Sequence, residues 1–302
     1  MITGCNLDEN IQGALRDTGL QVQHETGDPR SIPATTRNKT THLLITVFTE
    51  VDQDILECYP TLEAIITLSA GFDHIDLQAC EEAGVKTYRT AHYGDHTVAE
   101  HAFMLLLAHE RKLLETQGKP KTLDRTPHLG TELYGKTLGI LGVGGIGSTL
   151  AEIANGFSME VKGYDVQRHE ELEANDWFTY TTIQDICRTS DYVSLHLPLL
   201  PETKHTVDQS FLAGMKPDAI IINTGRAGLI DHDALLEALQ NNEVRGAVLD
   251  VVPSEKRETL QNQQNVLITP HHAFYTREAL RRIAEMAEQV INNAPQPRLR
   301  VN

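Results

Sequence analysis

The segment from Lys136 to Asp165 constrains the fold of this chain more than any other stretch. A short apolar run at 137–141 predicts a buried strand, and it leads directly into Gly-Val-Gly-Gly-Ile-Gly at 142–147. A segment with helical periodicity follows, and then a second strand that ends at Asp165. A strand, a glycine-rich turn, a helix, a second strand and an acid in this order are typical of a dinucleotide-binding βαβ unit.

Each glycine of the turn has a physical role in such a unit. Gly142 permits the tight turn, Gly144 lets a pyrophosphate approach the backbone, and Gly147 lets the helix pack closely on the strand. The N–H groups at the start of the helix, at Gly145 and Ile146, would then face the phosphates. A plain βαβ turn without a ligand is the alternative, but the complete unit favours dinucleotide binding.

Asp165 indicates which dinucleotide binds. It lies 23 residues after Gly142, where a carboxylate accepts hydrogen bonds from both ribose hydroxyls of an adenosine. The same carboxylate would repel a 2′-phosphate, so we expect NAD rather than NADP. Arg168, three residues further on, would offset part of that repulsion.

The overall charge and the cysteines restrict partners and compartment. The formal net charge of −16 disfavours nucleic acid and anionic membranes as partners, so an anionic substrate must be drawn by local arginines. No apolar run approaches the ~20 residues of a membrane span, and the first residues lack the pattern of a signal peptide. The four cysteines are far apart and are expected to be free thiols in a reducing cytoplasm: Cys5, Cys58, Cys80 and Cys187. We expect no metal ion.

The residues before the glycine turn predict a domain of their own, because strands alternate with helices there without a phosphate loop. The predicted elements are a strand at 41–48, a helix at 51–59, a strand at 62–69, a helix at 75–82 and a strand at 85–90. Such alternation implies a parallel sheet flanked by helices.

Residues 95–116 predict one long helix, with Asp95 as a candidate N-cap. Apolar residues occur on more than one of its faces, so it must be covered on several sides by a domain junction or a subunit interface. Residues 117–132 are polar, contain two prolines and two glycines, and predict a loop.

From Lys136 onward the alternation of strands and helices continues. Further strands are predicted at 191–197, 219–223, 246–251 and 265–269, a helix at 231–240, and a regular amphipathic helix at 276–292. Together with the two strands of the glycine unit this makes six strands, which fit a doubly wound nucleotide-binding domain.

Three residues that follow predicted strands suit hydride-transfer chemistry. Arg226 follows the strand at 219–223, Glu255 lies just past the strand at 246–251, and His271 follows the last strand. Ligands of this fold bind at the carboxyl ends of strands. A histidine can protonate the alkoxide that a hydride leaves on a 2-keto acid, a carboxylate can orient it, and an arginine can bind the substrate carboxylate. Alone, each residue is better explained as a surface or structural side chain.

A set of motifs in one order identifies a family. The motifs are Ser69-Ala70-Gly71-Phe72-Asp73-His74-Ile75-Asp76, Val98-Ala99-Glu100-His101, Leu141 to Gly147, Ser194-Leu195-His196-Leu197-Pro198, Ile222-Asn223-Thr224-Gly225-Arg226, Leu249-Asp250-Val251 and Thr269-Pro270-His271. From about Thr41 to Glu278 the chain resembles the D-isomer-specific 2-hydroxyacid dehydrogenase family.

The resemblance implies a role for each site residue. It implies that Arg226 binds substrate, that His271 is the acid/base and that Glu255 is its partner. It implies that the substrate is bound by the N–H groups of Ala70 and Gly71 and by Tyr93. It also implies cofactor contacts beyond the glycine turn and Asp165: Pro198, Thr203, and Asp250 at the nicotinamide carboxamide.

The resemblance also implies the architecture: two α/β domains with parallel sheets and a cleft between them. A Rossmann-type NAD-binding domain at 95–273 would be inserted into a smaller flavodoxin-like substrate domain, made of 1–94 and the returning helix at 274–302. The family is usually homodimeric, and we expect the helix at 95–116 to supply the dimer surface.

Two departures and one likeness mark this chain within the family. Ala227 follows Arg226 where the family often has glycine, and Gly145 stands where an arginine or histidine often contacts the pyrophosphate. The segment at 271–276, His-His-Ala-Phe-Tyr-Thr, is most similar to the D-lactate dehydrogenase branch.

The sequence therefore predicts an NAD-dependent oxidoreductase that interconverts a small 2-keto acid and a D-2-hydroxy acid, without indicating which one. Two alternatives stay open. One is an NAD-sensing binding protein, since the family includes transcriptional co-repressors; the other is phosphite oxidation on the same fold. Formate oxidation is disfavoured, because formate enzymes of this kind have glutamine in place of Glu255.

Overall fold

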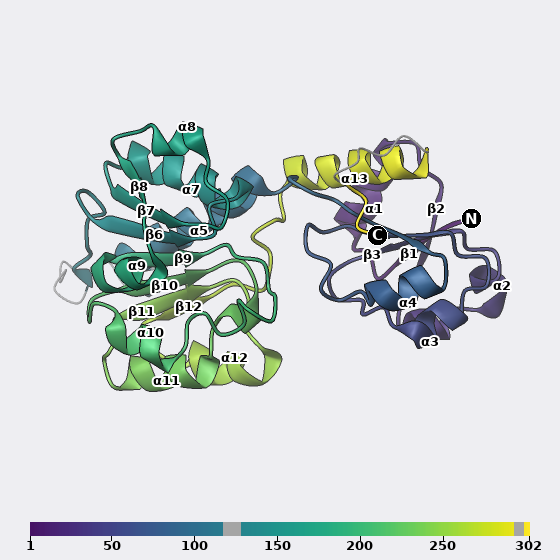
Figure 1. Cartoon of the computed structure of the whole chain (residues 1–302). Helices are drawn as coiled ribbons and strands as arrows, with labels where there is room; N and C mark the ends of the chain where they lie inside the picture. The colour runs from purple at the N-terminus through teal and green to yellow at the C-terminus, as the bar shows by residue number, and fades with distance from the viewer. Residues whose placement is uncertain (117–127, 293–298) are drawn as a thin grey trace. The chain divides into compact units, whose positions relative to one another are not determined.

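The computed structural model describes residues 1–116, 128–292 and 299–302 of the chain (Figure 1). These residues form two compact units, each with its own parallel sheet. The first unit is discontinuous and consists of Met1–Gly94 and Tyr275–Asn302, and the second is Asp95–Phe274. This division lies within one residue of the expected domain bounds.

The first unit contains a five-stranded sheet in the order β2-β1-β3-β4-β5, with every pair parallel. The strands are β1 (Ile2–Cys5), β2 (Val22–Glu25), β3 (His42–Ile45), β4 (Ala64–Thr67) and β5 (Lys86–Arg89). The helices are α1 (Glu9–Asp17), α2 (Ala34–Arg37), α3 (Gln53–Glu57), α4 (Leu77–Glu82) and the returning α13 (Arg277–Ile291). This strand order is that of flavodoxin-like sheets, so the predicted fold is confirmed.

The returning helix α13 completes the first unit by packing against α1. Its buried residues recur at helical spacing: Ala279, Leu280, Ile283, Ala284, Ala287 and Val290. The side chain of Thr276 caps its start by accepting a hydrogen bond from the N–H of Ala279 at 3.2 Å. The amphipathic pattern predicted at 276–292 thus corresponds to the buried face of α13.

The second unit contains a seven-stranded parallel sheet in the order β12-β11-β10-β9-β6-β7-β8. Its strands are β6 (Thr137–Leu141), β7 (Glu160–Tyr164), β8 (Phe178–Tyr180), β9 (Tyr192–Leu195), β10 (Ile220–Asn223), β11 (Gly246–Leu249) and β12 (Val266–Ile268). This is the strand order of a doubly wound nucleotide-binding sheet. From β6 the chain adds β7 and β8 on one side, and then crosses to add β9 to β12 on the other side, so the topological switch point lies between β6 and β9. The six strands predicted are all present, and the short β8 at the edge is additional.

Helices cover both faces of this sheet (Figure 1). They are α5 (Asp95–Glu110), α6 (Leu113–Thr116), α7 (Gly145–Gly156), α8 (Glu170–Glu173), α9 (Ile183–Thr189), α10 (Gln209–Gly214), α11 (His232–Gln240) and α12 (Ser254–Gln261), with a 3-10 turn η3 (Ala227–Leu229). Alternate residues of β10 enter opposite cores: Ile220 and Ile222 join the core beneath α5 and α7, and Ile221 joins the core of α10 and α11. A run buried on both faces explains why these strands are continuously apolar in sequence.

The region predicted as one helix at 95–116 is two helices, so that prediction is wrong in its length. Lys112 adopts a left-handed backbone with φ of 50°, which ends α5 before α6 begins. Asp95 is the first residue of α5. The helix is covered within its own unit by α7 and the neighbouring strands, where Ala99, Ala102 and Leu106 are fully buried.

None of the helices in the described ranges has both the length and the apolar content needed to cross a bilayer. The loop predicted at 117–132 lies largely outside the described residues, which resume at His128.

Candidate active site

The glycine turn joins β6 to α7 and has the geometry that a phosphate loop requires. Gly142 has φ of 95°, and a Cβ on it would lie 2.6 Å from the carbonyl carbon of His196, in the chain that leaves β9. A Cβ on Gly147 would lie 2.1 Å from the carbonyl oxygen of Gly142. Only glycine fits at either position, so the turn closes tightly at the point where the strand order reverses.

The start of α7 is open where a pyrophosphate would lie. Gly144 precedes the helix without a side chain that caps it, and no heavy atom lies within 4 Å of the position that a Cβ would occupy there. The N–H groups of the first turn therefore have space in front of them for an anion. A Cβ on Gly145 would lie 2.1 Å from Oδ2 of Asp95, at the start of α5, so this carboxylate occupies the place of the basic side chain that the family often has.

Asp165 follows β7 and holds the glycine turn. Its Oδ2 accepts a hydrogen bond from the N–H of Val143 at 2.7 Å, and its Oδ1 accepts one from the N–H of Gln167 at 2.9 Å. Arg168 is engaged elsewhere: its Nη1 pairs with Glu173 at 2.9 Å and its guanidinium lies over the ring of Tyr180. Arg168, the cation expected to offset the charge of Asp165, thus binds Glu173 and Tyr180.

His196 closes the other side of the reversal point, beyond β9. Its Nε2 shares a hydrogen bond of 2.8 Å with the hydroxyl of Ser194. Burial lowers the pKa of His196 from 6.5 to about 4, so its ring is neutral at pH 7. Further along this loop the hydroxyl of Thr203 donates to the carbonyl of Pro198 at 2.6 Å, which ties together the two residues expected to contact the cofactor.

Arg226, Glu255 and His271 follow the carboxyl ends of three adjacent strands, β10, β11 and β12. Their order along the sheet brings them to the edge that carries the glycine turn, as expected for a parallel sheet. Arg226 lies directly before η3, where its Nη1 donates to the carbonyl of Gly225 at 3.1 Å and its own carbonyl accepts from Nδ2 of Asn223 at 2.9 Å. The buried Asn223 thereby fixes the backbone that presents the guanidinium.

Glu255 lies in the first turn of α12 and is exposed to solvent. The hydrogen bond that the structure describes for it is from the hydroxyl of Ser254, at 3.2 Å to Oε2, and not from His271. Its placement near the carboxyl end of β11 agrees with the sequence, but its pairing with the histidine stays a prediction.

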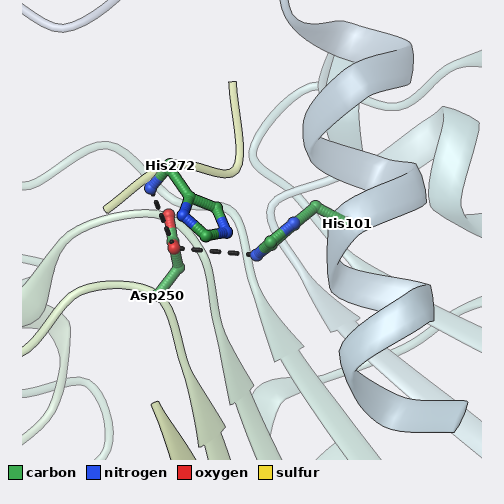
Figure 2. A group of neighbouring side chains, drawn as sticks. All are labelled: His101, Asp250 and His272. Carbon is green, nitrogen blue, oxygen red and sulfur yellow. Dashed lines mark hydrogen bonds and ion pairs between the residues drawn. The ribbon is translucent and has the colours of Figure 1, made fainter. Parts of the chain in front are cut away.

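Asp250 organises the loop after β12, where it lies beside His272 (Figure 2). Its carboxylate is fully buried; Oδ1 accepts from the hydroxyl of Thr269 at 2.6 Å and from the N–H of His272 at 3.0 Å, and Oδ2 accepts from the N–H of Ala273 at 2.9 Å. The N–H of His271 donates to the carbonyl of Asp250 at 2.9 Å, and His271 has φ of 54°. The carboxylate of Asp250 thus fixes the backbone that follows the histidine and the side chain of Thr269 before it, and the carbonyl of Asp250 fixes the N–H of the histidine itself.

His101, on α5, is a further member of this cluster. Its Nε2 lies 3.1 Å from the hydroxyl of Thr269 and 3.6 Å from Oδ1 of Asp250, and its ring meets that of His272 edge to face. Burial lowers the pKa of His101, while the charge of Asp250 opposes that shift.

Among the described residues, His101, Asp250 and His272 form a group whose potential metal-ligand atoms lie within 4.8 Å of one another. Hydrogen bonds already engage these atoms, since Oδ1 of Asp250 accepts from Thr269 and from a backbone N–H. The group is therefore described better as a hydrogen-bond network than as a metal site.

The residues expected to bind substrate in the first unit follow two neighbouring strands, with Ala70 and Gly71 after β4 and Tyr93 after β5. The hydroxyl of Ser69 donates to the carbonyl of Gly71 at 2.7 Å, and Nη1 of Arg89 donates to the carbonyl of Ala70 at 3.2 Å. Tyr93 is buried, and its carbonyl accepts a hydrogen bond of 2.7 Å from Nε of Arg282 on α13.

Sequence reasoning did not assign roles to His101 and Thr269, although both belong to quoted motifs. Their contact joins positions 168 residues apart, and no local pattern indicates it. The only signal in the sequence was the presence of polar side chains next to a buried helix face and at a strand end.

The second unit is thus a doubly wound α/β unit whose candidate site residues lie at the carboxyl edge of its sheet. Comparison with known proteins gives the family. Residues 103–273 match the model of the D-isomer specific 2-hydroxyacid dehydrogenase, NAD binding domain. This chain belongs to the D-isomer specific 2-hydroxyacid dehydrogenase family.

Relatives with different substrates are similar to it. A glyoxylate reductase of Aeropyrum pernix is 37% identical over 259 residues, which cover 82% of this chain and 77% of that protein. A D-3-phosphoglycerate dehydrogenase of Methanocaldococcus jannaschii is 32% identical over 96% of this chain and 60% of its own length. The D-lactate dehydrogenase of Aquifex aeolicus, solved with NAD and lactic acid, superposes with a TM-score of 0.83 at 28% identity and covers 97% of this chain and 96% of that one.

The family's cofactor is NAD, and the glycine turn fits it. The open space before Gly144, the uncapped start of α7 and the carboxylate of Asp165 beside the turn suit the pyrophosphate and the ribose.

Proposed function

We propose that this protein interconverts a small 2-keto acid and the corresponding D-2-hydroxy acid, with NAD as the hydride carrier. The observation that supports this most is the placement of Arg226 after β10 and His271 after β12, at the carboxyl edge of the sheet that carries the cofactor turn. The cofactor supplies or accepts the hydride at the substrate carbon. The chain has to bind the carboxylate, polarise the keto oxygen and move one proton.

Arg226 binds and polarises the substrate in this proposal. A guanidinium presents a planar fork that matches a carboxylate and stabilises negative charge on the keto oxygen. The hydrogen bond from Asn223 and the contact with the carbonyl of Gly225 hold it at the end of β10. Because the net charge of the chain is −16, this local cation has to outweigh an unfavourable overall field for an anionic substrate.

His271 moves the proton. In reduction it donates a proton to the oxygen that develops negative charge, and in oxidation it takes the proton back. Glu255 is proposed as the carboxylate that stabilises the protonated ring, which requires its exposed side chain to leave Ser254. Asp250 is proposed to meet the nicotinamide carboxamide with the acceptor capacity that its loop bonds leave on Oδ2.

The loop after β4 is proposed to bind the substrate carboxylate through the N–H groups of Ala70 and Gly71. Both carbonyls of this turn are engaged as acceptors, which orients its peptide groups, and neither N–H has an acceptor among the described contacts. Tyr93 is proposed to line the substrate pocket.

A kinetic panel tests the proposal. We expect loss of NADH absorbance with at least one of pyruvate, glyoxylate, hydroxypyruvate, phenylpyruvate and 2-ketoisocaproate, with a D-2-hydroxy acid as product by chiral chromatography. NADPH should be the poorer cofactor. Absence of turnover across the panel, from protein that binds NADH, would count against an enzymatic role and favour a binding protein of the same fold.

We also propose a homodimer formed through the region of α5 and α6. Large apolar side chains are exposed there and in the segments near it in sequence: Met104, Leu113, Leu114, Leu129 and Tyr134. Such exposure on a chain of this charge is typical of a surface that a second copy covers.

The four free cysteines, three of them buried, support a reducing, cytoplasmic location.

A further inference from the structure

We propose that His101 and Thr269 are positioning residues for His271: their hydrogen bonds hold the carboxylate of Asp250 so that it fixes the loop that presents the histidine. This inference rests on the proposed role of His271 as the acid/base. It adds two residues, on α5 and after β12, that touch neither the expected substrate nor the reacting atoms.

The direction of the hydrogen bonds supports a chain of defined order. The hydroxyl of Thr269 has one proton, and the 2.6 Å contact places that proton toward the carboxylate of Asp250. Its oxygen must then accept from His101 at 3.1 Å, so Nε2 of His101 carries a hydrogen. The network therefore runs from helix α5 through Thr269 to the carboxylate.

The carboxylate passes this restraint to the backbone around His271. It accepts from the N–H groups of the two residues that follow, His272 and Ala273, while the carbonyl of Asp250 accepts from the N–H of His271 itself. These bonds hold the backbone of His271 in a left-handed conformation, with φ of 54°. Residues other than glycine rarely adopt this conformation. Without them the loop would relax, and the imidazole would move away from its working position.

Burial makes the network effective. The side chain of His101 is 11% exposed and that of Asp250 is not exposed at all, so the hydrogen bonds form in a medium of low polarity. Removing the hydroxyl of Thr269 would remove one of the two hydrogen bonds to Oδ1 of the buried Asp250 and would leave Nε2–H of His101 with only the more distant Oδ1, at 3.6 Å. We expect this loss to change the geometry of the loop as well as to lower the stability of the protein.

Paired variants of Thr269 test the inference. Thr269→Val keeps the shape of the side chain and removes the hydroxyl, whereas Thr269→Ser keeps the hydroxyl. The control is Thr137→Val, the same substitution at a buried threonine of β6 that lies far from the carboxyl edge. We expect Thr269→Val to lower kcat by roughly 10- to 100-fold, the scale of a misplaced catalytic group. Thr269→Ser and Thr137→Val should stay within about threefold of the unmodified protein.

Dissociation constants for NADH, measured by fluorescence, separate positioning of His271 from damage to the cofactor site. They should change little in all three variants. His101→Leu should reproduce Thr269→Val, and His101→Gln, which can still donate from its amide, should recover part of the rate. Equal losses in the serine and valine variants of Thr269, or a loss of NADH affinity that matches the loss of kcat, would overturn the inference.

Hydrogen exchange read by mass spectrometry provides a test that does not need turnover. In Thr269→Val, peptides that contain His272 and Ala273 should exchange faster, while peptides from β6 and α7 should be unchanged. If the unmodified protein reduces none of the 2-keto acids, the proposed function fails and exchange still decides whether the network holds the loop. Unchanged exchange in this loop would refute the network, whatever the kinetics show.

Discussion

At the scale of single residues, the candidate site combines backbone fixed by buried side chains with one carboxylate that is exposed to solvent. Asn223 and Asp250 are buried at the ends of adjacent strands, and each holds the backbone of a proposed catalytic residue, Arg226 or His271. Glu255 is exposed, and the hydrogen bond described for it is from the adjacent Ser254. Fixed backbone next to the arginine and the histidine suits the roles proposed for them, because each of these roles depends on a defined position.

Replacement of His271 by glutamine tests the acid/base role. We expect His271→Gln to lower kcat by roughly 10²- to 10⁴-fold, because a glutamine cannot transfer the proton, while the dissociation constant for NADH changes little. Stopped-flow measurement of the hydride step and fluorescence titration of NADH check the two parts. His272→Gln is the control on the same loop, and a similar loss of kcat in both variants would argue against a specific role for His271.

Replacement of Asp165 by asparagine tests the cofactor preference. Asp165→Asn removes the charge but keeps an acceptor for the N–H of Val143, so the glycine turn should stay closed. Without a carboxylate to repel a 2′-phosphate, kcat/KM with NADPH should rise relative to NADH by roughly tenfold, about 1.4 kcal/mol. Steady-state assays with both cofactors measure the ratio, and the exposed Asp176→Asn provides the control. An unchanged ratio would show that preference lies elsewhere.

At the scale of elements, α5 links the two ends of the second unit's sheet. His101 contacts the loop after β12 near the carboxyl edge, and Glu110 is buried near the amino edge. Glu110 accepts hydrogen bonds from Nη1 of Arg245 at 2.9 Å and from the hydroxyl of Tyr192 at 3.3 Å. The helix is thus fixed by polar contacts at both ends and by apolar packing between them.

The Glu110 cluster predicts a dependence of stability on pH. Burial by itself would raise the pKa of Glu110, but hydrogen bonds from His109 and Arg245 outweigh it and lower the pKa from 4.5 to about 2. A depressed folded pKa stabilises the fold above pH 4.5, and that contribution is lost as pH falls from 4.5 toward 2.

Glu110→Gln should therefore lower the free energy of unfolding by about 3 kcal/mol at pH 7, and by much less near pH 3. Urea denaturation at the two pH values measures the difference. Glu115→Gln, which removes a carboxylate from an exposed pair with Lys112, is the control and should change stability by less than about 0.5 kcal/mol. A loss for Glu110→Gln that is independent of pH would contradict the ionic explanation.

Elements with strong patterns were predictable from sequence, and those with weak ones were not. The buried strands of the second unit and the helix α13 have clear periodicity, and their predicted and observed bounds differ by a few residues. β2, with the sequence Val-Gln-His-Glu, and the three-residue β8 have no such pattern, because they form at sheet edges where one side stays polar.

The candidate site was predictable to the extent that it follows strand order. Arg226 and His271 could be located because residues after parallel strands meet at one edge. The contact of His101 with Thr269 depends on how a helix packs across the sheet, and the bond of Ser254 to Glu255 depends on side-chain conformation. Neither is encoded in spacing along the chain.

At the scale of the whole molecule, the proposed dimer gives a direct prediction. The unmodified protein should have twice the monomer mass of 33.6 kDa in light scattering after size-exclusion chromatography. A double variant, Leu113→Asp with Leu114→Asp, should shift it toward the monomer, because both side chains are about half exposed and charges would be buried between copies. Val166→Asp, at an exposed apolar residue elsewhere, should leave the mass unchanged. A monomeric unmodified protein would refute the proposal.

The discontinuity of the first unit has a consequence for how the chain is made. α1 is synthesised near the start, but α13, which covers it, follows about 260 residues later. At ~5–20 residues per second a ribosome needs on the order of tens of seconds for that stretch. During this time α1 lacks the cover of α13, whereas the second unit emerges in one piece. The nucleotide-binding unit can therefore complete its fold first, and the nascent first unit is the part that would most need a chaperone.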